Sequence, residues 1–510
     1  MSATEIAHSV LRALVNAGVE HVVVCPGSRS GPLALVALAA EEAGLLTLHV
    51  RVDERTAGFL ALGISKSTHR PAAVITTSGT AVANLHPAML EAKHSKIPLV
   101  AVTADRPARL RGTGANQTTD QRNLFPGVAF VNIDKPMAEL TIDRATQLNV
   151  ELDVPLYEKD GTAWKPFEPK TTFVSEPDFV ESGLELELNE KTVVVAGDNA
   201  TATARQFAEQ AGLPLLAEPS SGARSGPNAI RTYRLLLPKF DVARVVMFGH
   251  PTLSRPITNL LAETEVVVVG QDFSNFPQQP NNARLSAGIP KLAKGATTWL
   301  EDWQRADIEL SARIDEYVDS IDSFTPYEVA REVARVETPL FLGSSNPIRD
   351  LDIMAGALPG WVFANRGLAG IDGTLSSAIG VSLATGSPVT CYLGDLTFLH
   401  DINGLLINES EPKGDVRFVV ANDNGGSIFT VLEQGGPGFA SSFERIFGTP
   451  TNANIEQICK AFNVKYSVAS SREELREKLS QAINGIEVVE VPISRFRRRE
   501  QNEHFSKLVY

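Results

Sequence analysis

Residues 394–426 read GDLTFLHDINGLLINESEPKGDVRFVVANDNGG, and this stretch decides the fold class. The apolar run PVTCYL ends at Gly394 and Asp395, a helix-like segment follows, and a second apolar run, VRFVVA, ends in polar residues. The pattern predicts a strand, a helix and a second strand, with a carboxylate at the C-terminal tip of each strand. In a parallel sheet the two tips are neighbours at the edge where ligands bind. An ordinary α/β crossover in which Asp caps a helix is the alternative interpretation.

The two carboxylates at these tips are Asp395 and Asp423. Hard oxygen donors at one sheet edge suit Mg²⁺, which keeps some of its waters and takes its remaining ligands from a bound diphosphate. The sequence therefore predicts a divalent cation and a diphosphate group at this edge.

The chain has 510 residues and a formal net charge of −13. It is too long for a single core, so several domains are expected. The negative charge argues against nucleic acid as a partner, because no broad basic surface is available to displace counterions. Residues 495–499, RFRRR, form a short basic run that we interpret as the solvated start of a helix.

Features of the whole chain predict a cytoplasmic protein. No apolar stretch approaches the roughly 20 residues that a bilayer-crossing helix needs. The N-terminal residues alternate like an amphipathic helix and lack the charged start and cleavage site of a signal peptide. Cys25, Cys391 and Cys459 are too widely spaced to indicate a disulfide framework or a zinc site.

Short β-branched runs that end in Gly, Asp, Ser or Asn recur in three groups. The groups are HVVVCPGS, AAVITTSG and PLVAVTAD; then TVVVAGD, RVVMFGH and EVVVVGQD; then PLFLGSS, WVFANRG, VTCYLGD and RFVVAND. Such runs, followed by helical periodicity, indicate parallel strands buried on both faces. We therefore expect an α/β fold of three tandem domains with mainly parallel sheets, at residues 1–157, 185–310 and 326–510, with a linker at 158–184.

Six further motifs occur in a fixed order: VCPGSRSGPL, HVRVDERTAGFLALGIS, TTSGTAVANLHPAMLEA, TADRPARLRGTGANQT, SNPIRD and ANRGLAGIDGT. Together with GDL and NDNGG they resemble the MenD family of thiamine-diphosphate enzymes, the menaquinone-pathway synthases. The resemblance covers the first and third predicted domains nearly throughout and the middle one weakly. It implies the thiamine-diphosphate-enzyme fold, with a pyrimidine-binding, a central and a diphosphate-binding domain.

The same resemblance implies a reaction and its partners. In this family 2-oxoglutarate is decarboxylated on thiamine diphosphate, and the succinyl carbanion equivalent adds to isochorismate in a 1,4-fashion. The cofactor carries the hard chemistry, while the protein supplies orientation and electrostatics. The implied cofactors are thiamine diphosphate and Mg²⁺ or Mn²⁺. The implied assembly is a homodimer or a dimer of dimers with active sites at the subunit interface.

Glu54 is the first candidate for catalysis. It follows the apolar strand LLTLHVRV and precedes a helix of small residues, so we expect its carboxyl in a tight, largely apolar crevice. Such a carboxyl holds a proton readily, which suits sharing one with a ring nitrogen. By resemblance that nitrogen is N1′ of the aminopyrimidine. The alternative is a surface salt bridge between Glu54 and Arg51 or Arg55.

The resemblance also assigns cofactor and metal contacts. The expected cofactor-binding residues are Pro26, Glu54, Thr80, Asn84, Ile371, Gly394, Asp395 and Leu396. The expected metal ligands are Asp395, Asp423 and the backbone carbonyl of Gly425. Many thiamine-diphosphate enzymes have Gly where this chain and the resembled family have Leu396. The second metal position usually offers Asn, so Asn422 is the alternative to Asp423.

Arginines are expected to bind the substrates, because planar guanidinium groups match the carboxylates of 2-oxoglutarate and isochorismate bidentately. The expected substrate-binding residues are Ser28, Arg29, Arg106, Asn116, Gln117, Arg255, Ser345, Arg349, Arg366, Ile428, Phe429 and Leu432. The last three would form an apolar wall for the cyclohexadiene ring. The expected catalytic residues are Glu54, Arg29, Gln117, Arg349 and Arg366.

Two other functions fit parts of the pattern. One is a thiamine-diphosphate 2-oxoacid decarboxylase or acetolactate-synthase-like carboligase; the arginine set and the GANQ motif argue against it, since small monocarboxylates need fewer cationic anchors. The other is a non-catalytic module with a cofactor fold, which the presence of both Glu54 and Asp395 disfavours. His86, His94 and His400 stand in no catalytic motif and receive no role. Residues 131–150 are shorter than the corresponding segment of the resembled family.

Overall fold

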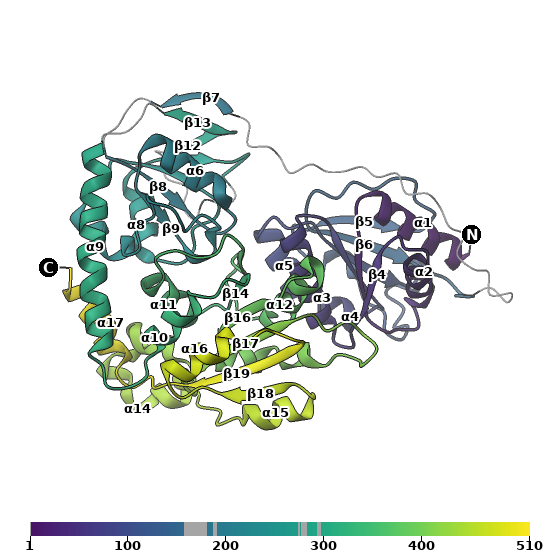
Figure 1. Ribbon diagram of the computed structural model, residues 1–510. Helices are drawn as coiled ribbons and strands as arrows, with labels where there is room; N and C mark the ends of the chain where they lie inside the picture. The colour runs from purple at the N-terminus through teal and green to yellow at the C-terminus, as the bar shows by residue number, and fades with distance from the viewer. Residues whose placement is uncertain are drawn as a thin grey trace. The chain divides into compact units, whose positions relative to one another are not determined.

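The computed structural model describes residues 2–157, 181–186, 191–273, 276, 283–292 and 297–509 (Figure 1). The chain divides into two compact units. The first comprises Met1–Glu176, Gly367–Val389 and His400–Val416, and the second comprises Pro177–Arg366, Thr390–Leu399 and Arg417–Tyr510. Helices alternate with mainly parallel strands in both units, which confirms the predicted α/β class. The predicted domain boundaries stay a prediction.

The first unit holds a six-stranded sheet in the order β2-β1-β3-β4-β6-β5. Its strands are β1 (His21–Val24), β2 (Thr47–Val50), β3 (Ala72–Thr76), β4 (Leu99–Asp105), β5 (Ala129–Ile133) and β6 (Thr146–Glu151). All the neighbouring strands run parallel. β3, β4 and β6 are buried along their whole length, as expected for apolar runs covered on both faces.

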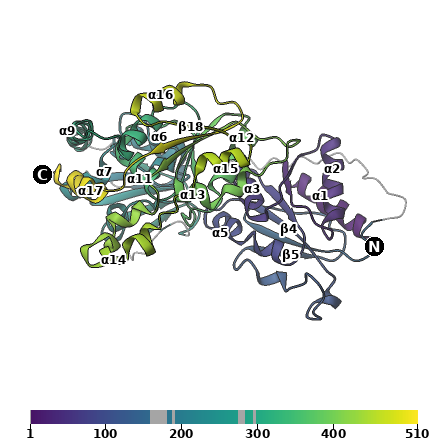
Figure 2. The ribbon, with the colours of Figure 1, turned by 90° about the horizontal axis from the view of Figure 1, so that it is seen from below.

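Helices cover both faces of this sheet. They are α1 (Ala3–Asn16), α2 (Gly31–Glu42), α3 (Glu54–Thr68), α4 (Thr80–Ala83), α5 (His86–His94) and α12 (Thr374–Thr385). α1 and α2 lie side by side (Figures 1 and 2), and their apolar residues pack with alternate residues of the strands, such as Val22 and Val24 of β1. α1 begins with a capping box, because Ser2 and Glu5 each accept the other's backbone N–H.

α12 joins the first unit although its sequence is far from the rest. It packs against α3, and glycines permit the close approach of the two backbones. A Cβ atom on Gly63 would lie 2.1 Å from the carbonyl oxygen of Ser377, and one on Gly380 would lie 2.3 Å from that of Leu60. Any larger residue at either position would force the helices apart.

The second unit holds a five-stranded sheet, β12-β11-β10-β8-β9, and a two-stranded sheet, β13-β7. The strands are β7 (Glu181–Leu186), β8 (Thr192–Ala196), β9 (Leu215–Ala217), β10 (Arg244–Phe248), β11 (Glu265–Val269), β12 (Ala283–Ser286) and β13 (Ile289–Leu292). The helices of this part are α6 (Thr201–Ala211), α7 (Tyr233–Leu236), α8 (Arg255–Glu263) and α9 (Thr297–Asp319). The predicted linker lies outside the described residues up to 180, and its last residues belong to β7.

The second unit also holds a six-stranded sheet in the order β15-β14-β16-β17-β19-β18. Its strands are β14 (Leu340–Leu342), β15 (Val362–Ala364), β16 (Val389–Gly394), β17 (Val416–Asn422), β18 (Lys465–Val468) and β19 (Ile486–Pro492). The helices are α10 (Pro326–Val333), α11 (Asn346–Met354), α13 (Asp395–His400), α14 (Ala440–Phe443), α15 (Ile455–Ala461), α16 (Arg472–Ser480) and α17 (Arg498–Lys507). The strand, helix and strand predicted from residues 394–426 are β16, α13 and β17, and the two strands are neighbours.

Two further findings concern the expectations from composition. The three cysteines are all buried, and none of them forms a disulfide. No helix in the described part of the chain combines the length and the apolarity that a membrane crossing requires.

Candidate active site

In the first unit, predicted site residues follow four parallel strands at the same sheet edge. Pro26, Ser28 and Arg29 follow β1, Glu54 follows β2, Thr80 and Asn84 follow β3, and Arg106 follows β4. Of these, Pro26, Ser28, Thr80 and Asn84 are exposed, as are Asn116 and Gln117 in the segment after β4. The parallel arrangement therefore gathers the predicted polar groups at one edge, where α/β folds bind ligands.

Glu54 is the first residue of α3, where the helix dipole favours a carboxylate. Asp53 caps the helix by accepting the backbone N–H groups of Arg55 and Thr56. The Nδ2 atom of Asn84 donates to Oε2 of Glu54 over 3.2 Å, so two residues predicted to contact the cofactor lie together. The carboxyl is half-buried in the single chain, rather than enclosed in a tight crevice.

Arg51 and Arg55, the partners of Glu54 in the alternative surface salt bridge, interact with other groups. The guanidinium of Arg51 lies 3.8 Å from Glu411, and its Nη1 donates to the carbonyl of Val50. The guanidinium of Arg55 donates to the carbonyl oxygen of His400 over 2.6 Å. Arg51 therefore binds the backbone at Val50, and Arg55 binds the backbone at His400.

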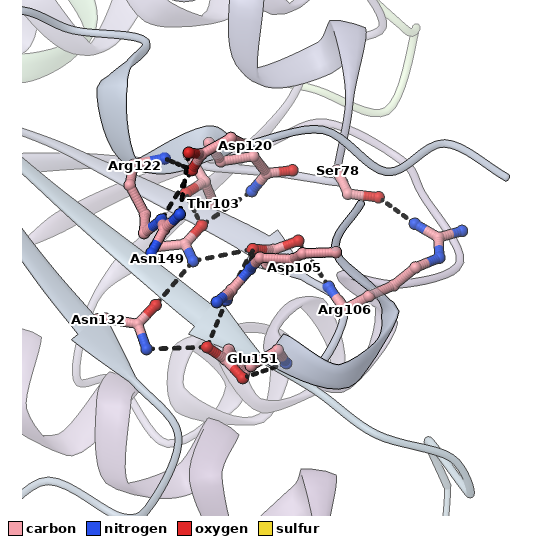
Figure 3. Close-up of polar contacts among 12 residues, drawn as sticks. Ser78, Thr103, Asp105, Arg106, Asp120, Arg122, Asn132, Asn149 and Glu151 are labelled. Carbon is pink, nitrogen blue, oxygen red and sulfur yellow. Dashed lines mark hydrogen bonds and ion pairs between the residues drawn. The ribbon is translucent and has the colours of Figure 1, made fainter. Parts of the chain in front are cut away.

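The segment after β4 brings Arg106 together with Ser78 (Figure 3) and with Gln117. Nη1 of Arg106 donates to Oγ of Ser78 and to the carbonyl oxygen of Gln117, both over 2.7 Å. Gln117 has a φ of 55°, which is uncommon for a residue with a side chain and typical of functional loops. Arg29 donates to the carbonyl of Leu152, and burial together with the charge of Arg106 lowers its pKa.

Glu91 in α5 makes a long-range contact that the sequence did not predict. It is buried, and its two carboxylate oxygens accept the backbone N–H groups of Gly367 and Leu368 over 2.7 and 2.8 Å. These two residues begin the segment that leads to Ile371, an expected cofactor-binding residue. A carboxylate inside an otherwise apolar helix face was the only signal, because its partners lie 276 residues away.

In the second unit, Asp395 and Asp423 come from neighbouring strands, as predicted. Asp395 is 4% exposed, and its carboxylate accepts the backbone N–H of Gly425. Burial, followed by the charge of Asp423, raises the pKa of Asp395 to about 7. Burial also raises the pKa of Asp423, whose carboxylate accepts the hydroxyl of Ser427. Two nearby, poorly solvated carboxylates are a donor set that a divalent cation stabilises.

The geometry around Asn422 bears on the choice of the second ligand. Nδ2 of Asn422 donates to Glu490 over 2.6 Å, and its Oδ1 accepts the backbone N–H of Asn424 over 3.0 Å. Both ends of this amide are therefore engaged away from Asp395, whereas Asp423 interacts with Asp395 electrostatically. The described residues contain no group of three or more His, Cys, Asp or Glu side chains that could hold a metal.

Gly425 lies between the two strands' ends in a conformation reserved for glycine. Its φ is 143°, and an added Cβ would lie 2.0 Å from the carbonyl oxygen of Gly448. Only glycine lets the backbone approach this closely while its N–H reaches Asp395.

The prediction that the basic run at residues 495–499 is a solvated helix start was wrong about the solvation of Arg495 and Arg498, although α17 does begin at Arg498. Nη1 of Arg495 donates to the carbonyl of Asn424 over 2.6 Å. Arg498 is 4% exposed and forms a buried ion pair with Asp350. Arg499 donates to the carbonyls of Thr430 and Leu432 over 2.8 and 2.6 Å. Arg495 and Arg499 therefore hold the segment that contains Asp423, Gly425 and the predicted apolar wall.

Arg366 and Arg349 lie close enough to influence one another. Arg366 is buried and donates to Oγ1 of Thr252 over 2.8 Å and to its carbonyl over 3.1 Å. Arg349 is half-buried and donates to the carbonyl of Ser345, and burial followed by the charge of Arg366 lowers the pKa of Arg349 to about 10. Two desolvated cations placed together form an anion-binding arrangement. Ser345 has a φ of 82°, a strained conformation at the start of α11.

Glu218 supports this arrangement and was also missed. Its carboxylate accepts the backbone N–H groups of Thr252 and Leu253 over 3.1 and 2.8 Å. Complete burial raises the pKa of Glu218 to about 7, and the N–H groups and the charge of Arg366 oppose that rise. Glu218 thus fixes the turn at Thr252, to which Arg366 donates. No local sequence pattern indicates this contact, because the two sites are far apart in the chain.

Arg255 and the predicted apolar wall complete the second unit's set. Arg255 is the first residue of α8, its side chain is 76% exposed, and it lies 3.4 Å from the carboxylate of Glu433. Ile428, Phe429 and Leu432 are half-buried. The ring of Phe429 lies against that of Phe447, with centroids 5.6 Å apart. The structure therefore brings Arg255 close to the residue that follows Leu432.

Two family models match parts of the chain. Residues 4–124 match the thiamine pyrophosphate enzyme, N-terminal TPP binding domain, and residues 354–491 match the thiamine pyrophosphate enzyme, C-terminal TPP binding domain. A benzoylformate decarboxylase structure from Polynucleobacter necessarius is similar in fold, with a TM-score of 0.66 and 16% identity over 96% of this chain and 98% of that chain.

Sequence relatives are much closer. The chain is 47% identical to a 2-succinyl-5-enolpyruvyl-6-hydroxy-3-cyclohexene-1-carboxylate synthase of Nocardioides sp., over 99% of this chain and 98% of that protein. It is 40% identical to the protein of the same name from Renibacterium salmoninarum, over 96% of this chain and 94% of that protein. By this near-full-length likeness, the chain belongs to the 2-succinyl-5-enolpyruvyl-6-hydroxy-3-cyclohexene-1-carboxylate synthase family of thiamine pyrophosphate enzymes.

Proposed function

We propose that this protein is a transferase of menaquinone biosynthesis that joins a succinyl unit from 2-oxoglutarate to isochorismate, with release of carbon dioxide. The product is 2-succinyl-5-enolpyruvyl-6-hydroxy-3-cyclohexene-1-carboxylate. The observation that carries the proposal is 47% identity over almost the whole chain to a synthase of that name. The second unit's paired cations, Arg349 and Arg366, support it because both substrates are dicarboxylates.

The chain's own residues fit thiamine diphosphate with a divalent cation, Mg²⁺ or Mn²⁺. Asp395, Asp423 and the carbonyl of Gly425 would hold the metal, since the buried carboxylate pair offers only hard oxygen donors. Gly394 and Leu396 flank the first of these ligands. Pro26, Thr80, Asn84 and Ile371 would contact the rest of the cofactor. When bound, the thiazolium supplies the electron sink for decarboxylation and carbon–carbon bond formation.

Glu54 would hold and return one proton at N1′ of the aminopyrimidine. Its position at the start of α3 and its hydrogen bond from Asn84 orient the carboxyl for that exchange. Because the bond from Asn84 leaves Oε1 available for a second partner, the same carboxyl can bridge the ring nitrogen and the protein.

The arginines would bind and orient the substrate carboxylates. Arg29 and Arg106 belong to the first unit, and Arg255, Arg349 and Arg366 belong to the second. Their guanidinium groups donate bidentately, which fixes direction as well as charge. The smaller polar contacts would come from Ser28, Asn116, Gln117 and Ser345, and the apolar wall of Ile428, Phe429 and Leu432 would exclude water from the ring of isochorismate.

We also propose that the enzyme works in the cytoplasm as a homodimer or a dimer of dimers, with Glu54 of one protomer and Asp395 of its partner completing each site. Mixing the variants Glu54→Gln and Asp395→Asn tests the assembly. Random pairing of two inactive variants should restore about a quarter of the wild-type activity, because each mixed dimer has one intact site. A mixture that stays inactive after subunit exchange would contradict a shared site.

An isochorismate assay tests the function. The purified protein is incubated with isochorismate, thiamine diphosphate and Mg²⁺, and the loss of isochorismate is followed with 2-oxoglutarate, with pyruvate or with neither. We expect rapid loss with 2-oxoglutarate alone. Equal rates with pyruvate would favour an acetolactate-synthase-like carboligase, and cofactor binding without any turnover would favour a non-catalytic module.

A further inference from the structure

The side chain of Gln121 lies between two segments that the proposed function uses. Gln121 begins a short 3-10 helix, Gln121–Asn123, and is fully buried. Its Oε1 accepts the backbone N–H of Gly79 over 2.9 Å. Its Nε2 donates to Oδ1 of Asn149 over 2.8 Å and to the carbonyl of Ala104 over 3.3 Å. One donor faces the oxygen and two acceptors face the nitrogen, so the surroundings fix the orientation of the amide.

On one side, Gln121 holds the turn that carries a predicted cofactor contact. Gly79 has a φ of 78° and immediately precedes Thr80, the first residue of α4. Its N–H is directed to Gln121, and its carbonyl accepts the N–H of Val82. The position of Thr80 therefore depends on the bond from Gly79 to Gln121.

On the other side, Gln121 ends the segment that carries predicted substrate contacts. The tip of this segment touches the same turn, because Arg106 and Ser78 both donate to the carbonyl of Gln117. A Cβ atom on Gly79 would lie 3.2 Å from the side chain of Gln117. The cofactor turn and the substrate segment are thus in contact at their tips, and one buried amide ties both to the sheet.

The start of the segment is anchored in the same polar network (Figure 3). Nδ2 of Asn149 donates to Oδ2 of Asp105 over 3.0 Å, and Nε of Arg111 donates to the same oxygen over 3.2 Å. Arg111 also pairs with Glu151, whose other oxygen accepts the backbone N–H of Ala108 over 2.9 Å. Residues 106–121 are therefore held at both ends by β4 and β6, and Asn149 links the two anchors.

We propose that Gln121 is a positioning residue. It fixes the position of the cofactor turn, Ser78–Thr80, relative to the substrate segment, Arg106–Gln117. The inference rests on the proposed function of these two segments. Without the amide, the Gly79 N–H loses its buried acceptor, so the turn must move or open to water. A displacement of about 1 Å at a reacting centre lowers a rate by roughly a hundredfold, so the relative position of the two segments matters to catalysis.

Amide hydrogen exchange of the full-length protein with thiamine diphosphate and Mg²⁺ tests this tether, by which we mean the hydrogen bonds of the Gln121 side chain to Gly79 and Asn149. In Gln121→Met, we expect exchange to rise by about tenfold or more in both residues 77–84 and residues 106–120. Gln147→Met is the matched control. Gln147 is equally buried in this network and donates to Thr103 and to the carbonyl of Gln121, and Gly79 is not its partner. The control should leave exchange at residues 77–84 unchanged.

Steady-state kinetics test the consequence. Gln121→Met should raise the apparent KM for thiamine diphosphate and lower kcat by about tenfold or more, whereas Gln147→Met should change neither beyond about twofold. Gln121→Glu gives a pH readout, because a protonated glutamate keeps the acceptor for Gly79 and one donor for Asn149. Its exchange at residues 77–84, relative to the wild type at the same pH, should return toward the wild type as the pH falls.

Three results would overturn the inference. They are equal effects of the two methionine variants, an exchange increase spread equally over α11 in the second unit, and unchanged kinetics of Gln121→Met in an active enzyme. The exchange measurement does not depend on the reaction. A wild-type protein that forms no product would therefore contradict the proposed function, while the tether would still be decided by exchange at residues 77–84.

Discussion

The charge of Asp423, at the end of β17, acts on the buried carboxyl of Asp395, at the end of the neighbouring strand β16, and with burial raises its pKa to about 7. The backbone fixes this relationship, because Gly425 donates its N–H to Asp395 only two residues after Asp423. A buried carboxyl whose pKa is raised by a neighbouring carboxylate is unfavourable to ionise unless a cation is bound. The pair therefore supports the proposed metal site, whose remaining ligands would be waters and oxygens of the backbone or of a bound diphosphate.

Asp423→Asn should weaken Mg²⁺ binding by about tenfold or more, because it removes one of the two negative charges near the metal. Calorimetric titration with Mg²⁺ in the presence of thiamine diphosphate measures the effect. Asn422→Ala is the control, since that amide is bonded to Glu490 and to Asn424. Weaker binding in Asn422→Ala than in Asp423→Asn would show that the neighbouring residue is the ligand.

Glu54→Gln should retain thiamine diphosphate binding and lower kcat by about a hundredfold or more, because an amide cannot exchange a proton with the ring nitrogen. Fluorescence titration of the cofactor and turnover of isochorismate separate the two effects. Glu42→Gln, at the exposed end of α2, should behave as the wild type. Near-normal turnover in Glu54→Gln would remove the proposed proton exchange.

Arg499→Met should raise the KM for isochorismate by about tenfold and leave Mg²⁺ binding unchanged. The reason is that Arg499 donates to the carbonyl of Leu432, which belongs to the predicted apolar wall, and to that of Thr430 within the same segment. Arg497→Met is a matched control on the same basic run, because Arg497 is exposed and pairs with Glu500. Equal KM values for the two variants would contradict a role for Arg499 in holding the wall.

His49→Gln should reduce the loss of stability in mild acid. His49 is buried beside His21, with 3.2 Å between their ring nitrogens, and burial followed by the charges of His21 and Arg51 lowers its pKa to about 3 from the model-peptide value of 6.5. Since the folded pKa is lower than the unfolded pKa, the contribution of neutral His49 is complete above 6.5 and is lost as the pH falls toward 3.

At about pH 5.5 this loss amounts to about 1 kcal/mol of the free energy of unfolding, relative to neutral pH. Thermal denaturation of wild type and His49→Gln at neutral pH and at about pH 5.5 measures it. The drop in melting temperature should be smaller in the variant. An equal drop in both proteins would show that the pKa of His49 does not differ between the folded and unfolded states.

The sequence predicted the elements that local pattern controls. Short β-branched runs separated by helical segments predicted the parallel strands. The order of β16, α13 and β17 followed from residues 394–426. The sequence could not predict contacts between distant segments. Glu91 binds the backbone at residue 367, and Glu218 binds the backbone at residue 252, and nothing local to either glutamate indicates a partner.

The basic run shows the same limit in the opposite direction. Five residues rich in arginine are typical of a solvated surface, yet Arg498 is buried because Asp350 lies 148 residues earlier in the chain and directly beside it in space. Helix α12 is a similar case. Gly63 in α3 and Gly380 in α12 are needed because the two helices pack closely, and only the structure shows that contact. Charge and glycine content mark such positions, but they do not identify the partner.

The most direct test of the synthase proposal is the ratio of carbon dioxide released from 2-oxoglutarate to isochorismate consumed, in the presence of thiamine diphosphate and Mg²⁺. If the enzyme couples decarboxylation to carbon–carbon bond formation, the two amounts are equal throughout the reaction and both fall to background without either substrate. Carbon dioxide release that continues undiminished without isochorismate would show a simple decarboxylase and would contradict the proposal.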